Sequence, residues 1–451
     1  MAIKPGQGLV SLGPQASGQA MAHPAQRAIF DRIVELIEQL RALEQPTDFF
    51  EFQRLLFGLL YQVEERRGQC SRMIKRLQRG RGAPQDAPPP PNSGDPSEKA
   101  SWELEAYVYE RLARQLRTVG DGFAWRCFGY NRQVIQTLSR NDSAGPMYGK
   151  IGLPYELGTI QHLWESDGRF ALHHDLTNCL RIADLTEFTG EAGALLREIK
   201  RTPHAEKAQM DRAQAAINAL MDDGDLPGGR PGARLVRLDE PYVTNLKELG
   251  ELLVHAKEHG CQGMALSQGR ALIASSLPAC LRIWGSDHEA QGQALVTTRR
   301  EAIEQAGIAD ALHHIKGISG DTAARQPILA PWSIYPFPPT DCAALICDLL
   351  IFETITSDQA LMDSFERAGL RGEVLLTPTS GQLTGTMGIV CAHLGQRALT
   401  WHAYGLGVLL FELAEPDTLT RGSAELLRMA SPPTEPTIAY SGEEENWLPR
   451  L

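Results

Sequence analysis

The 451-residue sequence predicts a mixed α/β protein with two or three domains. Apolar side chains recur at helical spacing, as in "AQRAIFDRIVELIEQLRALEQ", where Ile29, Ile33, Ile37 and Leu40 share one helix face. Short apolar runs such as "GIVCAHLG" have the length and composition of strands. Hydrophobic residues at 43% and charged residues at 22% are typical of a globular protein.

The first part of the chain predicts a flexible tail (1–24), a helical hairpin (25–79) and a Pro-rich linker (80–97). The second helix of the hairpin ends in a basic run, "RRGQCSRMIKRLQRGRG", which we interpret as a solvated helix end, with a phosphate-contacting patch as the minority alternative. The Pro run of the linker favours an extended conformation and cannot build a core, so we place a domain boundary near residue 90.

The segment 98–240 predicts a second domain that begins with two helices, "EKASWELEAYVYERLARQLR" and "NRQVIQTLSRN". From residue 154 the expected order is helix, three strands, helix, strand. The elements are "LPYELGTIQHLWESDG", the two strands within "RFALHHDLTNCLRIADLTEF", and then "ALLREIKRT", "PHAEKAQMDRAQAAINALMDDG" and "ARLVRLD".

The remaining segment, 241–440, predicts a C-terminal α/β or α+β domain, followed by an acidic tail (441–451). Its expected helices are "NLKELGELLVHAKEHG" and "SDQALMDSFERAG", and its expected strands include "CQGMALS", "RALIASS", "ALTWHAY" and "GLGVLLFEL". We find no recognisable chemistry in this segment.

The stretch "RIADLTEFTGEAGALLREIKRT" carries the candidate chemistry. An antiparallel hairpin centred on Glu191 places Asp184 and Glu198 at equal distances from the turn, so that they face each other, with Lys200 on the same face as Glu198. Opposed like charges are unfavourable in a sheet unless a cation lies between them. Carboxylate oxygens suit Mg²⁺, for which Mn²⁺ can substitute, and a bound metal activates water and polarises a phosphoryl oxygen. Lys200 would orient that water or stabilise charge on the phosphate.

This pattern resembles the PD-(D/E)XK nuclease superfamily over roughly residues 150–240: Asp184 precedes Glu198-Ile199-Lys200, although Ala183 stands where the motif has Pro. The resemblance implies a restriction-endonuclease-like αβββαβ core and a third metal-binding carboxylate, Glu156, on the preceding helix. If the core began earlier, that carboxylate would instead be Glu103, Glu105 or Glu110. The resemblance also implies that the helix after the third strand turns polar residues toward the substrate, here Gln209, Arg212 and Gln214.

Other short motifs give weaker signals. "HHD" (173–175) is similar to the His-Asp pair of HD-type phosphohydrolases, but that family is helical and this segment predicts strand and turn. Asp175 is expected to cap the turn, with His174 or Asp175 as a minority candidate for substrate contact. "HH" at 313–314 is expected at the surface or core edge. The sequence contains no P-loop, no G-x-G-x-x-G and no G-x-S-x-G motif.

These residues predict a Mg²⁺-dependent endonuclease, with DNA favoured over RNA, and analogy with the superfamily suggests a role in restriction or anti-phage defence. Two alternatives remain: a non-catalytic nucleic-acid-binding or scaffold protein with a nuclease-like core, and another metal-dependent phosphohydrolase. The helical hairpin is a candidate homodimer interface, and the C-terminal domain a candidate site for a regulatory partner.

The composition limits the partners and the compartment. A net charge of −11 excludes a generic polyanion binder, although a local basic surface is compatible with it. The eight Cys residues are scattered without a C-x-x-C pair, as expected of reduced thiols. The N-terminal residues contain no apolar signal region, and no apolar run has the length of a membrane span. We therefore expect a cytoplasmic protein that makes no membrane contact.

Overall fold

The computed structural model describes residues 14–81, 91–92, 95, 97–139, 145–189, 193–199, 214–215, 233–308, 314–319, 329–376, 388–401, 403–429 and 435–441. The chain forms two compact units. Unit 1 comprises Met1–Gly228 with Pro331–Ser333, and unit 2 comprises Gly229–Ala330 with Ile334–Leu451. The mixed α/β class predicted from the sequence is confirmed, and each unit is described below by itself.

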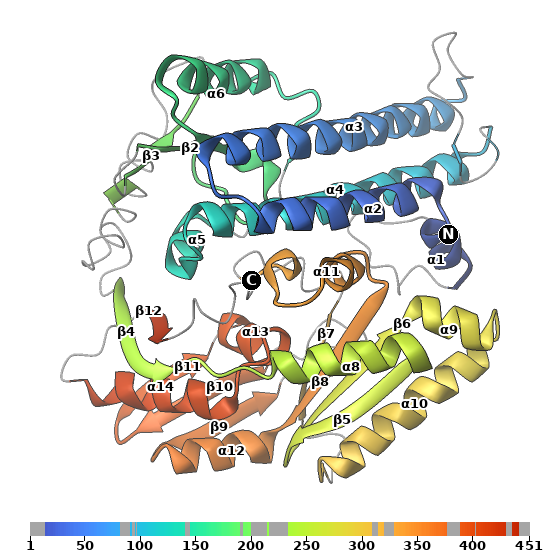
Figure 1. Ribbon diagram of the computed structural model, residues 1–451. Helices are drawn as coiled ribbons and strands as arrows, with labels where there is room; N and C mark the ends of the chain where they lie inside the picture. The colour runs from blue at the N-terminus through green and yellow to red at the C-terminus, as the bar shows by residue number, and fades with distance from the viewer. Residues whose placement is uncertain are drawn as a thin grey trace. The chain divides into compact units, whose positions relative to one another are not determined.

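Unit 1 is built on long helices that lie side by side (Figure 1). Its helices are α1 (Pro14–Met21), α2 (Pro24–Arg41), α3 (Pro46–Gln78), α4 (Lys99–Cys127), α5 (Arg132–Leu138) and α6 (Leu153–Asp167). The apolar faces of α2, α3 and α4 meet in a core that fully buries Ile33, Leu56 and Leu112. Because α3 and α4 pack directly on each other, the compact units do not divide at the Pro-rich linker near residue 90.

The sheet of unit 1 contains the predicted hairpin. Its strands, in the order β1-β2-β3, are β1 (Ala171–His173), β2 (Leu185–Phe188) and β3 (Ala194–Arg197), and the 3₁₀ turn η2 (His174–Leu176) follows β1. All pairs are antiparallel, and the β2–β3 register runs from Leu185↔Arg197 to Phe188↔Ala194. This register is centred on residue 191, as the sequence predicts. The ladder ends at the pair Leu185↔Arg197, one position short of Asp184 and Glu198. These two residues would form the next pair if the register continued by one step.

The remainder of the predicted αβββαβ core is not found among the described residues. Of the helix expected after β3, only 214–215 are described, and both are helical. The expected last strand exists as β4 (Ala233–Pro241), but it pairs in parallel with β12 (Glu435–Ser441) in unit 2 and not with β1–β3. An apolar run predicts a strand from its local pattern, whereas its partner is chosen by long-range packing.

Unit 2 contains a four-stranded antiparallel sheet of order β5-β6-β8-β7. Its elements are α8 (Leu246–His259), β5 (Cys261–Ser267), β6 (Arg270–Ser276), α9 (Leu277–Trp284), α10 (His288–Gln305), β7 (His314–Ile318), α11 (Pro339–Ile346) and β8 (Leu350–Ser357). The 3₁₀ turn η4 (Trp332–Ile334) begins in the short segment of unit 1 and ends at the first residue with which unit 2 resumes. Helices α8 and α10 pack against β5 and β6 (Figure 1). The core between α10 and the sheet includes Ala271, Ile273, Ala302 and Ile355.

A second antiparallel sheet of unit 2, of order β11-β10-β9, is covered by α12 and α14. The elements are α12 (Asp358–Arg367), β9 (Arg371–Leu376), β10 (Gly388–Leu394), β11 (Arg397–Trp401), α13 (Ala403–Phe411) and α14 (Pro416–Arg428). The run "GLGVLLFEL", predicted as a strand, lies largely in helix α13, so that prediction is wrong. A continuous apolar run fits a buried helix as well as a buried strand.

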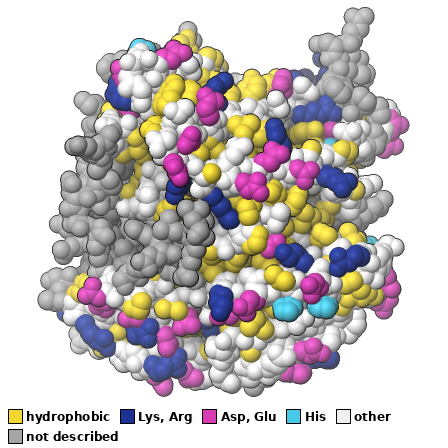
Figure 2. Space-filling model, viewed as in Figure 1, with side chains coloured by type: hydrophobic (Ala, Val, Ile, Leu, Met, Phe, Trp, Pro, Cys, Tyr) yellow, Lys and Arg dark blue, Asp and Glu magenta, His cyan; other side chains and the backbone are white. Residues whose placement is uncertain are grey.

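The surface shown in Figure 2 carries acidic and basic side chains interspersed with one another. On this face the described Lys and Arg side chains do not gather into one basic patch. Among the residues that the structure describes, no helix combines the length and apolar character needed to cross a bilayer.

Candidate metal centre

Five titratable side chains of unit 1 converge into one group, called here the Lys150 cluster: Lys150, Glu156, His173, Asp175 and Asp184. The Lys150 Nζ atom lies 2.9 Å from Glu156 Oε1, 2.8 Å from Asp175 Oδ2 and 3.4 Å from Asp184 Oδ1. His173 Nε2 lies 2.9 Å from Glu156 Oε2 and 3.9 Å from Asp175 Oδ2. Two of the carboxylates predicted from the sequence, Glu156 and Asp184, therefore meet around a cation.

Glu156 reaches the cluster from the first turn of α6. Pro154 fits this turn because the first backbone N–H groups of a helix have no intrahelical acceptor. A carboxylate is also favoured near a helix N-terminus by the helix dipole. The Glu156 residue is only 1% exposed, so its charge depends on Lys150 and His173 for compensation.

Asp184 is held by the open end of the β2–β3 hairpin. Its Oδ2 accepts a hydrogen bond from the Ile199 backbone N–H at 2.8 Å, and its own N–H donates to the Arg197 carbonyl at 3.0 Å. The preceding residue, Ala183, has a φ of 70°, in the left-handed region that non-glycine residues rarely adopt. Proline, whose φ is fixed near −65°, could not take this conformation, so the departure from the Pro of the superfamily motif has a structural basis.

Asp175 lies in η2, which packs directly against α4. A Cβ atom at Gly120 would lie 1.9 Å from the Leu176 carbonyl oxygen, so glycine is required for this close approach. Arg117 Nε donates to the Asp175 carbonyl at 3.1 Å. Asp121 accepts hydrogen bonds from the backbone N–H groups of the residues that follow η2, at 2.6 Å and 2.9 Å. Helix α4 thus fixes the backbone that carries Asp175.

Lys150 and His173 are positioned by helix α3. Glu64 accepts hydrogen bonds from the backbone N–H groups of Met147 at 2.6 Å and Tyr148 at 3.1 Å, which fixes the loop that leads to Lys150. Gln53 accepts from the His173 N–H at 2.9 Å and donates to the carbonyl of Ala171, also at 2.9 Å. Gln53 and Glu64, about three turns apart on the same face of α3, therefore set two members of the cluster.

The cluster contains three carboxylates, one ammonium and one imidazole, so its possible negative charges outnumber its possible positive charges. Burial raises the pKa of Glu156, but the hydrogen bonds from His173 and Lys150 outweigh it and the pKa is lowered. For Asp175, burial is again outweighed, here by the charge of His173 and by Lys150, and the pKa is lowered. Burial lowers the pKa of Lys150, but Asp175 and Glu156 more than offset it and raise the pKa. These groups are therefore charged at neutral pH, and ionised carboxylates are what a metal requires.

Acidification is expected to destabilise unit 1 through this cluster. Because the folded-state pKa values of Glu156 and Asp175 are lowered, their contribution is complete above about pH 4.5 and is lost as the pH falls through the depressed values. Urea unfolding between about pH 6 and pH 3, followed by a spectroscopic probe confined to unit 1, should show this loss. Glu156→Gln, which cannot titrate, should give a shallower dependence. If the unfolding free energies of the native chain and of Glu156→Gln depended on pH in the same way, Glu156 would not be a source of this acid sensitivity.

No significant match to this chain is found among models of protein families, curated protein sequences or solved structures. The function proposed below is therefore inferred from the geometry of the site.

The other predicted site residues have varied positions. Glu198 follows β3 and is partly buried, whereas Lys200, Gln209 and Arg212 lie outside the described residues. Gln214 does not support a substrate-facing role, because its amide accepts from the Leu196 N–H at 2.7 Å and donates to the Ala194 carbonyl at 2.6 Å, along the edge of β3.

His174 is buried, with its Nε2 2.7 Å from Thr186 Oγ1, and burial lowers its pKa to about 3. Its neutral ring belongs to the interior of the sheet and does not fit a substrate contact. The three alternatives to Glu156 are engaged elsewhere on α4: Glu103 pairs with Lys99, Glu105 with Arg66 and His23, and Glu110 with Arg67.

Sequence reasoning missed two members of the cluster. Lys150 lies in a loop without a motif, and nothing in its neighbours points to a site. For His173, the available signal is its place in "HHD", at the end of a strand and shortly before Asp175. His173, at the end of β1, pairs with Leu185 at the start of β2, and Leu185 directly follows Asp184. This pairing brings His173 beside Asp184.

Proposed function

We propose that the Lys150 cluster binds a divalent metal ion and that the protein is a metal-dependent nuclease, with DNA as the preferred substrate. One observation carries the proposal: carboxylates from α6, η2 and the end of the β2–β3 hairpin all lie within 3.4 Å of a single ammonium nitrogen. One ammonium and one imidazole carry at most two positive charges, fewer than three carboxylates can carry negative charges, so the group attracts further positive charge. The resemblance to the PD-(D/E)XK superfamily supports DNA as substrate and a role in defence, by analogy.

The donor atoms fit Mg²⁺, with Mn²⁺ as a substitute, because both prefer carboxylate oxygens. A bound ion would supply Lewis-acid polarisation of a phosphoryl oxygen and a more acidic water. Glu156, His173 and Asp175 have donor atoms within 4.8 Å of one another and would hold the ion, and Asp184, beside them on Lys150, would join them through a small side-chain movement. The Lys150 side chain, 31% exposed, can turn its ammonium from these carboxylates toward a phosphate oxygen, where it would bind and orient the substrate.

The direct test is cleavage of DNA. The purified full-length chain is incubated with plasmid, linear duplex, single-stranded DNA and RNA, each with Mg²⁺, with Mn²⁺ and with excess EDTA. We expect cleavage of at least one DNA substrate that EDTA abolishes and that added metal restores. Cleavage that persists in EDTA would contradict the proposal. Preference for RNA would retain the chemistry and overturn the substrate assignment.

One observation favours a different function. Lys150 already contacts all three carboxylates, so the cluster is also suited to a structural ion-pair network that ties the 145–152 loop to the sheet. In that case the chain would act as a nucleic-acid-binding or scaffold protein. Failure to cleave any nucleic acid with either metal would favour this alternative. Hydrolysis of a small chromogenic phosphodiester without nucleic-acid cleavage would instead indicate another metal-dependent phosphohydrolase.

A further inference from the structure

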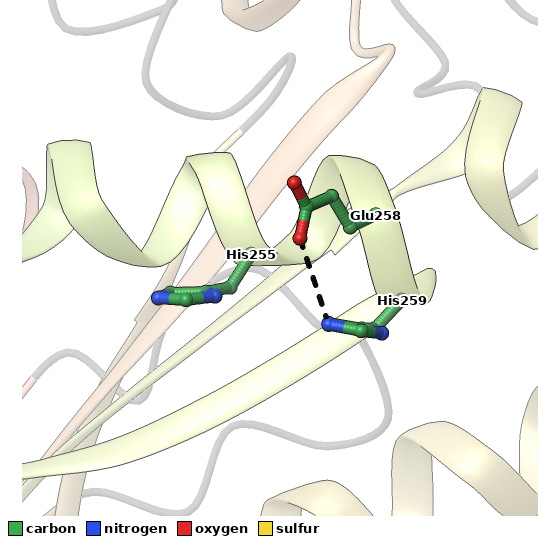
Figure 3. Close-up of side chains that lie close together, drawn as sticks. All are labelled: His255, Glu258 and His259. Carbon is green, nitrogen blue, oxygen red and sulfur yellow. Dashed lines mark ion pairs between the residues drawn. The ribbon is translucent and has the colours of Figure 1, made fainter.

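The last turn of α8 in unit 2 presents three potential metal ligands: His255, Glu258 and His259. Side chains four residues apart lie on the same face of a helix, so the two imidazoles are neighbours. One donor atom from each of the three residues can be chosen so that all lie within 4.8 Å of one another. Figure 3 shows both rings and the carboxylate close together on α8, with Glu258 Oε2 3.7 Å from His259 Nε2.

This donor set is richer in nitrogen than the Lys150 cluster, which offers three carboxylates and one imidazole. Two imidazole nitrogens and one carboxylate oxygen suit Zn²⁺ and neighbouring transition metals, whereas Mg²⁺ and Ca²⁺ prefer oxygen ligands. Zn²⁺ held by three protein ligands keeps a fourth position open for water or an added ligand. The arrangement therefore selects for a different class of ion from the one proposed in unit 1.

The surroundings leave the three ligands accessible. The His259 and Glu258 side chains are 62% and 65% exposed, so small rotations can bring the donors onto an ion without disturbing the core. Lys257, which lies between the histidines in sequence, is held elsewhere: its Nζ donates to Asp341 Oδ1 at 2.7 Å and Oδ2 at 2.8 Å. This ion pair balances the charge of Lys257, so Lys257 does not compete with a metal ion for Glu258.

The backbone of this turn is also fixed. Arg282 Nη2, from α9, donates to the carbonyls of Lys257 and Glu258, each at 3.0 Å. The C-terminal end of a helix carries partial negative charge, which favours a cation beside it. The ligands thus project from a supported helix end rather than from a loose terminus.

We infer that His255, His259 and Glu258 form a surface Zn²⁺ site on α8, independent of the metal centre proposed in unit 1. The two histidines bind through ring nitrogens across one helical turn, the carboxylate completes the protein ligands, and water occupies the open position. Ion binding ties the last turn of α8 together and stabilises the fold by mass action, because the unfolded chain lacks this geometry.

The test is titration of the full-length chain with Zn²⁺ by isothermal calorimetry, with Mg²⁺ in large excess to occupy the carboxylates of the Lys150 cluster. We expect one Zn²⁺ site whose affinity falls at least about tenfold in His255→Ala and in His259→Ala, and by a smaller factor in Glu258→Gln. Co²⁺ should bind at the same site, with visible absorption bands that these variants lose.

His288→Ala is the matched control, because His288 is an exposed histidine on the neighbouring helix α10 and lies outside the ligand group. It should bind Zn²⁺ as the native chain does. Unchanged affinity in the His255→Ala/His259→Ala double variant would overturn the inference, as would an equal loss in His288→Ala. The substituted side chains are exposed, so far-ultraviolet circular dichroism of the metal-free variants should match that of the native chain.

Discussion

Replacing Asp184 by Asn is expected to reduce metal-dependent DNA cleavage by at least about 100-fold, the upper end of losses seen when the support of a metal ligand is removed. Asn has nearly the shape of Asp, and its Oδ1 can still accept the hydrogen bond from the Ile199 N–H, now 2.8 Å from Asp184 Oδ2. The hairpin end should therefore keep its structure. What is lost is the negative charge 3.4 Å from the Lys150 ammonium, and with it one metal ligand.

The measurement is the initial rate of cleavage across a range of Mn²⁺ concentrations. A lost ligand should raise the metal concentration needed for half-maximal rate as well as lower the maximal rate. Asp167→Asn is the control. Asp167 is an exposed carboxylate of the same unit, paired with Arg169, so this substitution removes the same charge at a position outside the cluster. Equal rates for Asp184→Asn and the native chain would remove Asp184 from the active site. Equal losses in both variants would point to a general effect of charge on DNA binding.

The hairpin was predictable because its information is local. The turn residues, the strand alternation and the position of Glu191 determine the register, and the observed pairs from Leu185↔Arg197 to Phe188↔Ala194 follow it. Glu156 was predictable at the level of its helix, since "LPYELG" has a clear helix start. The superfamily resemblance then selected it among the acidic residues of the segment.

The rest of the site depends on contacts that are distant in sequence. Lys150 enters the cluster because a loop is bound by Glu64, a residue on a helix predicted to belong to a separate hairpin domain. Asp175 enters because Gly120 lets η2 approach α4. Similarly, nothing in the pattern of β4, in the middle of the sequence, reveals that its partner is β12, near the C-terminus. The periodicity of an element shows which of its faces is buried, but not which other element packs against that face.

Replacing Glu64 by Ala is expected to destabilise unit 1 by about 3–5 kcal/mol, the cost of removing one partner of a buried ion pair. Glu64 is 2% exposed and Arg117 is 3% exposed, and Glu64 Oε1 lies 2.5 Å from Arg117 Nη2. Without Glu64, the guanidinium stays buried, and its acceptors among the described residues are the Asp175 and Gly145 carbonyls. The backbone N–H groups of Met147 and Tyr148 also lose their acceptor, so the loop that carries Lys150 loosens.

Because the chain has two units, a single unfolding midpoint would mix their transitions, and hydrogen exchange at the amides of α3 and α4 is the better measure of this loss. Glu51→Ala is the control, since Glu51 lies on the same helix in an exposed pair with Arg54, and it should leave exchange unchanged. A Glu64→Leu/Arg117→Met double variant should be less destabilised than the sum of its single changes, because it leaves no buried charge unpaired. If Glu64→Ala left exchange unchanged but weakened Mn²⁺ binding, Glu64 would act only by positioning the loop of Lys150. If both were unchanged, the loop would be held by other contacts, and the path from α3 to the metal centre would be wrong.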